Sequence, residues 1–147
     1  MDRVVSARPL SRPRRRVRDP KVVALYHEIR SGLLCEWCHR AVGTEANHIL
    51  HGQKKEDAFW NLMVLCHDCH QNPVYGFHGQ SPRCSVEGSL RRKLEQGFSL
   101  PREAWAYLDG VDSWPGTDLD LGHEVDLAKR IAASEREGRV AYDHRRR

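Results

Sequence analysis

Two Cys-x-x-Cys pairs, Cys35–Cys38 and Cys66–Cys69, constrain this chain more than any other feature of its sequence. A turn of this spacing directs two sulfurs to one ion, and two such turns complete the tetrahedral four-sulfur shell that suits zinc. A closed shell leaves no coordination position for a substrate, so the pattern predicts a structural zinc. The alternative, unpaired core cysteines, requires two pairs to arise by chance among five cysteines.

The composition favours one small domain supplemented by metal. The chain has 147 residues, of which 39% are hydrophobic and 30% charged, so a small core with polar extensions is expected. We find neither a signal-peptide pattern near Met1 nor an apolar stretch long enough to span a membrane. These observations predict a cytoplasmic chain without a membrane partner, where reduced cysteines bind metal. Cys84 lies outside the pairs and is expected to be a free or buried thiol.

Positive charge is concentrated at the ends of the chain. The formal net charge is +4, and residues 1–20, with seven arginines and two aspartates, account for +5. Residues 127–147 are also basic, whereas residues 109–126 are acidic. Such ends suit a polyanionic partner such as DNA, which they would bind in a salt-dependent way. The alternative is a solvated tail without a partner.

The pattern of residues predicts three regions. We expect a disordered Arg-rich arm over residues 1–18, a core with a leading helix over 19–80 and a helical extension with a basic tail over 81–147. The leading helix should span residues 21–30, with Asp19 as N-cap and Pro20 at its first position.

Within the core, the 27 residues between the cysteine pairs must form structure of their own, and a β-hairpin fits. We expect a knuckle at 33–41, a strand at 46–50, a polar loop at 52–58, an apolar run at 61–65 and a short helix from about Cys66 that ends before Pro73. Beyond the core we expect helices at 86–96, 101–108 and 127–136 and an acidic loop at 109–126. These elements predict an α+β fold.

Several linked motifs occur in order over residues 33–79. They are Cys-x-x-Cys, then Asn47-His48-Ile49, then Asn61-Leu62, then Leu-Cys-x-x-Cys-His ending at His70. This order resembles the HNH nuclease family in its zinc-stapled form. The resemblance implies a treble-clef-like ββα-metal core that is braced by the structural zinc and holds one catalytic divalent ion such as Mg²⁺. It also implies an endonuclease that hydrolyses DNA, of a kind frequent in phages and mobile elements, with packaging proteins such as terminase as possible partners.

The resemblance also implies roles for individual residues. His48 matches the general base that activates water, for which an imidazole is well suited. Asn61 matches the residue that fixes the hairpin loop and so orients the base. His70 matches a ligand of the catalytic ion, although it can alternatively serve as a redundant zinc ligand. His51 and His78 are further candidate ligands of that ion.

Asn47 is where the sequence departs from the family pattern. The family commonly has Asp or His at this position, where it binds the catalytic ion, and a neutral amide oxygen is a weaker ligand. Strand alternation would also direct Asn47 and His48 to opposite faces unless the strand ends or bulges there. This departure leaves a second hypothesis open: a non-catalytic zinc module that binds nucleic acid or protein.

Overall fold

The computed structural model describes residues 15–108, 114–116 and 119–146. Its centre is an antiparallel sheet of two strands, β1 (Glu45–His48) and β2 (Leu62–Leu65). The helices around it are α2 (Pro20–Ile29), α3 (His67–Gln71), α4 (Val86–Gln96), α5 (Arg102–Trp105) and α6 (Leu121–Arg146), and the strand connection contains two 3-10 turns, η1 (Gly52–Lys54) and η2 (Phe59–Asn61). This is a small α+β fold, as the sequence predicts. Its assignment to the HNH type stays a prediction.

Helix α2 begins where the sequence places its cap. The Asp19 side chain accepts a hydrogen bond from the amide of Lys21 at 3.0 Å, and Pro20 occupies the first position, where a missing N–H costs nothing. The helix buries Val22, Tyr26 and Ile29. These side chains anchor α2 on the two-stranded sheet and on η2 in the connection between its strands.

The two strands lie in the segment of sequence between the two cysteine pairs and form an antiparallel ladder, which confirms the expected hairpin. Glu45 lies opposite Leu65 and His48 opposite Leu62. All four residues of β2 are buried, whereas β1 is mostly half-buried. The first strand begins one residue earlier than predicted and ends at His48, because the chain then turns into the long connection to η2.

A buried polar cluster ties the first cysteine knuckle to three other elements. The Glu36 carboxylate accepts hydrogen bonds from the Tyr26 hydroxyl at 2.7 Å and from the Val64 amide at 2.7 Å. Lys93 on α4 donates to the same hydroxyl at 2.8 Å, and the guanidinium of Arg30 lies 3.7 Å from the carboxylate. Buried charges require such partners, so α2, β2 and α4 are held in fixed positions around the knuckle.

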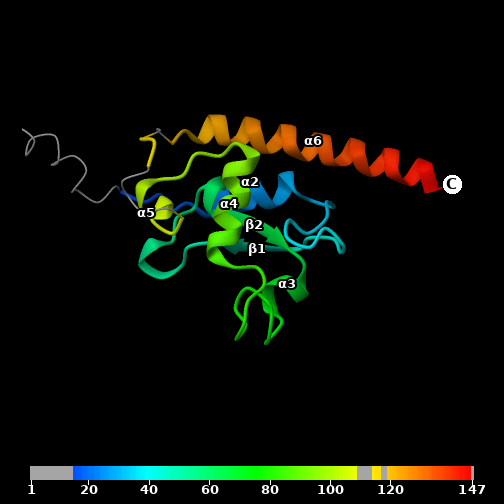
Figure 1. The fold of residues 1–147 in the computed structure, drawn as a ribbon. Helices are drawn as coiled ribbons and strands as arrows, with labels where there is room; N and C mark the ends of the chain where they lie inside the picture. The colour runs from blue at the N-terminus through cyan, green and yellow to red at the C-terminus, as the bar shows by residue number, and fades with distance from the viewer. Residues whose placement is uncertain (1–14, 109–113, 117–118, 147) are drawn as a thin grey trace, which may run out of the picture.

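Helix α6 corrects the predicted boundary of the acidic loop. It begins at Leu121, inside the segment expected to be a loop, and lies across one side of the molecule alongside α2 before it projects past the body (Figure 1). Asp120 accepts a hydrogen bond from Gly122 at 3.1 Å, the interaction of an Asx cap. Buried Glu124 then accepts from the amides of Phe59 and Trp60 at 3.1 and 2.9 Å. The first turn of α6 therefore supports η2 through buried Glu124 and is not part of a loop.

The helices after the core and Cys84 largely match the sequence prediction, whereas the N-terminal arm differs from it. Helix α4 has the predicted bounds, Cys84 is buried as expected, and α5 is shorter than predicted because the chain continues in turns after Trp105. Residues 15–18 fall within the predicted disordered arm, but they lie along the connection between β1 and β2. The Val17 amide donates to the Glu56 carboxylate, and the Val17 carbonyl accepts from the Asp57 amide. The rest of the arm, residues 1–14, lies outside the described residues.

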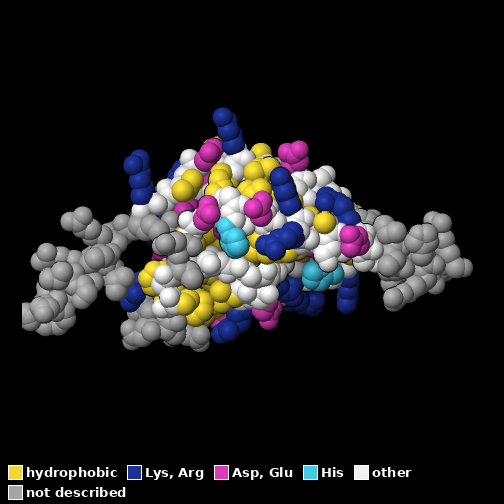
Figure 2. Space-filling model, turned by 90° about the horizontal axis from the view of Figure 1, so that it is seen from above, with side chains coloured by type: hydrophobic (Ala, Val, Ile, Leu, Met, Phe, Trp, Pro, Cys, Tyr) yellow, Lys and Arg dark blue, Asp and Glu magenta, His cyan; other side chains and the backbone are white. Residues whose placement is uncertain are grey.

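The surface over α6 carries charges of both signs. In Figure 2, Lys and Arg side chains alternate with Asp and Glu on the visible face. Among the described residues, that view therefore presents no continuous basic patch for a polyanion. Among the helices of the described residues, none is both long and apolar enough to cross a membrane.

Candidate functional site

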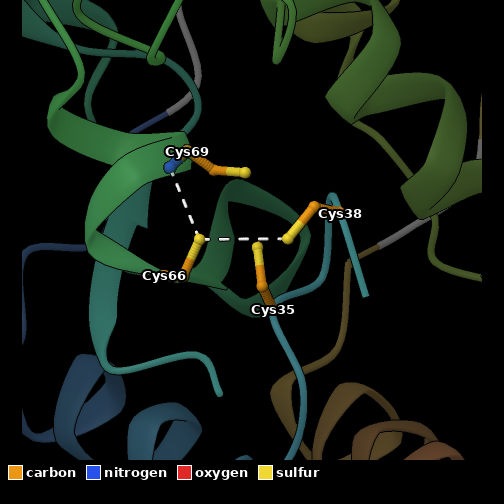
Figure 3. A group of neighbouring side chains, drawn as sticks. All are labelled: Cys35, Cys38, Cys66 and Cys69. Carbon is orange, nitrogen blue, oxygen red and sulfur yellow. Dashed lines mark hydrogen bonds between the residues drawn. The ribbon is translucent and has the colours of Figure 1, made fainter. Parts of the chain in front are cut away.

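Two turns bring the four paired cysteines together. Cys35 and Cys38 come from the knuckle, and Cys66 and Cys69 from the N-cap and first turn of α3, with the sulfurs facing one another (Figure 3). All four sulfur atoms lie within 4.8 Å of one another. Backbone amides donate to three of these sulfurs, from Trp37, Arg40 and Cys69 to Cys35, Cys38 and Cys66, at 3.4, 3.5 and 3.4 Å. This cluster can hold a metal ion such as zinc.

The ionisation of these thiols also favours a bound cation. Burial opposes ionisation of Cys38, but hydrogen bonds from the amides of Arg40 and Ala41 lower its pKa to about 7. Burial raises the pKa of Cys66, and burial together with the neighbouring thiols raises the pKa of Cys69. Without a cation, ionisation of Cys66 and Cys69 is therefore opposed, whereas thiolates are the form that binds metal.

Four histidines form a row of neighbouring rings, which we call the histidine row: His48, His51, His78 and His70. The ring centroids are 6.3 Å apart between His48 and His51, 5.1 Å between His51 and His78, and 4.9 Å between His78 and His70. The Nε2 atoms of His70 and His78 are 3.1 Å apart. The structure thus brings together the predicted base and all three predicted imidazole ligands.

His78 reaches His70 although a Pro-containing insertion separates them in sequence. After α3 the chain folds back, and the amides of Phe77 and His78 donate to the carbonyls of Cys69 and His70 at 2.7 and 3.3 Å. The turn is too tight for a side chain at Gly79, because a Cβ there would lie 2.7 Å from the carbonyl oxygens of Asn72 and Val74. The fold of this loop sets the position of His78.

The imidazoles in the middle of the row are held neutral. Burial and the neighbouring rings of His78 and His48 lower the pKa of His51 to about 4. Burial and the ring of His70 also lower the pKa of His78 below its ordinary value. A neutral imidazole has a lone pair available, which is the form that binds a metal ion.

His48 is paired with a carboxylate that sequence reasoning did not identify. Its Nε2 atom lies 2.8 Å from the Oδ1 atom of Asp57. The carboxylate accepts the Nε2 proton, so the lone pair of a neutral His48 is on Nδ1. His48 and Asp57 line a groove of about 500 Å³ between α2 and β1, together with Lys55 and His27. Nothing in the sequence pattern marks Asp57 as the partner, because eight residues of the strand connection separate it from His48.

Asn61 holds the loop that leads from His48 to Asp57. It is fully buried. Its Oδ1 atom accepts from the Leu50 amide at 2.7 Å, and its Nδ2 atom donates to the carbonyls of Leu50 and Glu56 at 3.2 and 3.0 Å. These contacts have the loop-fixing form that the resemblance implies for this residue. The effect on catalysis stays a prediction.

Asn47 points away from His48, as strand alternation requires. Its side chain is 1% exposed, and neither its amide oxygen nor its amide nitrogen has a hydrogen-bond partner among the described residues. It shares its face of β1 with Glu45, which contacts His70 of α3. A buried amide without partners is costly, and an ion or water on this face would supply the missing interaction.

Glu45 is the second carboxylate that sequence reasoning missed. Its two oxygens lie 2.8 Å from Nδ1 of His70 and 2.7 Å from Nδ1 of His67. Although partial burial opposes ionisation, the hydrogen bonds from these two rings lower the pKa of Glu45. The available signal was alternation, since Glu45 lies two residues before Asn47 on the same strand face.

Comparisons with known proteins add no assignment: no protein-family model, curated protein or solved structure matches this chain. The site must therefore be interpreted from its own residues.

Proposed function

We propose that the protein is a metal-dependent HNH-type endonuclease that hydrolyses phosphodiester bonds in DNA. The observation that supports this most is the 3.1 Å separation of the Nε2 atoms of His70 and His78, in the same histidine row as the His48–Asp57 pair. Two nitrogens that are each about 2.1 Å from one ion lie about 3.0–3.4 Å apart for angles of about 90–110°. The pair therefore has the spacing of two ligands on a single ion.

In this proposal the four cysteines hold a structural zinc. The shell is complete without His39 and His67, which flank the cysteines and are exposed. His70 is consequently available for a second ion, because its ring faces His78 and Glu45. The zinc fixes the first turn of α3 through Cys66 and Cys69 and thereby the position of His70.

The second ion would be held by His70 and His78, with the buried amide oxygen of Asn47 as the candidate third ligand. Imidazole ligands suit transition-metal ions such as Mn²⁺ or Ni²⁺, and Mg²⁺ is the alternative with more water in its shell. When bound, the ion would polarise the scissile phosphate and stabilise the leaving oxygen.

His48 would act as the general base. Because Asp57 holds the Nε2 proton, Nδ1 accepts a proton from the water that attacks phosphorus, and the carboxylate stabilises the imidazolium that results. The pair resembles the base and orienting acid of other hydrolytic sites in role. The resemblance to HNH nucleases implies that such cleavage would leave 5′-phosphate and 3′-hydroxyl ends. Lys55, at the edge of the same groove, is a candidate contact for the DNA backbone.

The second candidate is a non-catalytic zinc module that binds nucleic acid or protein. Asn47 favours it, because the position lacks the carboxylate or imidazole that would hold the ion more strongly.

Reduced cysteines and a DNA substrate fit the cytoplasm of a bacterial host, and phage packaging proteins such as terminase are candidate partners by analogy only.

Conversion of supercoiled plasmid distinguishes the two candidates. We expect the zinc-loaded protein to nick or linearise plasmid DNA when Mg²⁺, Mn²⁺ or Ni²⁺ is added and to stop when a chelator removes that ion but leaves the zinc. Binding of DNA without any strand break in all three ions would instead support the non-catalytic module.

A further inference from the structure

One carboxylate holds two histidines of the same short helix. Glu45, on β1, directs one oxygen to His70 and the other to His67, both at Nδ1. The side chain of His67 is 77% exposed, whereas that of His70 is 12% exposed. His67 therefore presents its far nitrogen to solvent, and the far nitrogen of His70 faces His78.

The carboxylate decides which nitrogen of His70 carries the proton. An ionised carboxylate can only accept hydrogen bonds, so Nδ1 of His70 must donate and Nε2 must hold the lone pair. The side-chain amide nitrogen of Gln71 also lies 3.3 Å from Nδ1 of His70. It could donate only to an unprotonated Nδ1, but this contact is longer than the 2.8 Å contact with the charged carboxylate, which therefore decides the tautomer. The lone pair on Nε2 is then directed at the position between His70 and His78.

The backbone fixes both ends of this contact. Glu45 lies opposite Leu65 in the sheet. Leu65 directly precedes Cys66, the N-cap of α3. The cap places the first turn of α3, and the strand places the carboxylate beside it. With an ion beside Nε2 of His70, the carboxylate and the ring would form the carboxylate–histidine–metal arrangement that orients ligands in metal sites.

We infer that Glu45 is a positioning residue for the second divalent ion: it holds His70 in the Nδ1-protonated tautomer with Nε2 directed at the ion. This inference rests on the ion position proposed above, but it does not require that the protein cleave DNA. It assigns a role to a residue outside the predicted set of His48, Asn61, His70 and the candidate ligands.

Two measurements on the full-length, zinc-loaded protein test the inference. Calorimetry gives the affinity for Mn²⁺ and Ni²⁺, and ¹⁵N–¹H spectra of the imidazole rings report the tautomer of His70. We expect Glu45→Ala to weaken ion binding by about 10–100-fold and to abolish the Nδ1-protonated form of His70. Glu45→Gln, which preserves the shape of the side chain, should weaken it less.

His67→Ala is the matched control, because it removes the other partner of the same carboxylate. It should bind Mn²⁺ within about twofold of wild type, and all variants should retain one zinc per chain. Glu45 variants with wild-type affinity and an unchanged His70 tautomer would overturn the inference, as would a wild-type protein that binds no ion beyond the zinc. A protein whose ion affinity depends on Glu45 and His70 but that never cleaves DNA would refute only the nuclease proposal.

Discussion

Replacing Cys66 with serine is expected to unfold the centre of the chain. Cys66 supplies one of the four sulfurs and is also the N-cap of α3, where its sulfur accepts from the Cys69 amide at 3.4 Å. Structural zinc contributes about 10–16 kcal/mol to small metal-binding domains, whereas the whole stability of a domain is about 5–15 kcal/mol. Loss of the ion should therefore exceed what the small core provides.

The expected result is a Cys66→Ser protein that holds less than one zinc per chain and melts without a cooperative transition. The same outcome should follow when a strong chelator removes zinc from the wild type. Cys84→Ser is the control, because this buried thiol lies outside the cluster and its sulfur is 3.7 Å from the Ser89 hydroxyl oxygen. That variant should keep its zinc and lose about 1 kcal/mol. Equal melting curves for wild type and Cys66→Ser would contradict the structural role of the zinc.

The second large effect is expected at His48. A general base contributes about 10²–10⁴-fold to a hydrolytic rate, so single-turnover cleavage of plasmid DNA by His48→Ala should be slower by that factor. Asp57→Asn, which keeps the shape of the partner but removes its charge, should slow cleavage by a smaller factor of about tenfold or more, because the imidazolium loses its counter-charge.

The binding of Mn²⁺ should be unaffected by His48→Ala, since His70 and His78 hold the ion in this account. His123→Ala is the control for removing an exposed imidazole, because His123 lies on α6 outside the histidine row. If His48→Ala cleaves within threefold of wild type (about 0.6 kcal/mol in the barrier), His48 is not the base.

Local signals in the sequence were sufficient for the framework of the fold. The cap at Asp19, the Cys-x-x-Cys spacing and the apolar run before Cys66 each depend on neighbouring residues, so α2, the cluster and β2 follow from short patterns. The start of α6 was missed because Glu124 is held by the amides of η2, more than sixty residues away in sequence.

The site was predictable only where a residue's role depends on sequence order. Order predicted His48, Asn61 and His70 as candidates, but not the carboxylates that contact the two imidazoles. Asp57 and Glu45 reach the rings through a loop and across a strand, and such contacts depend on tertiary packing that no short pattern encodes. His78 was only one of several candidate ligands until the tight turn at Gly79 placed it beside His70.

The location of manganese in a crystal tests the two-ion account most directly. Crystals of the zinc-loaded protein grown with Mn²⁺ can be measured at the absorption edges of both metals. The account predicts zinc among the four cysteines and a separate manganese peak within coordination distance of Nε2 of His70 and Nε2 of His78. If Mn²⁺ supports cleavage in solution but the two imidazoles remain hydrogen-bonded to each other with no manganese between them, the proposed active site is wrong.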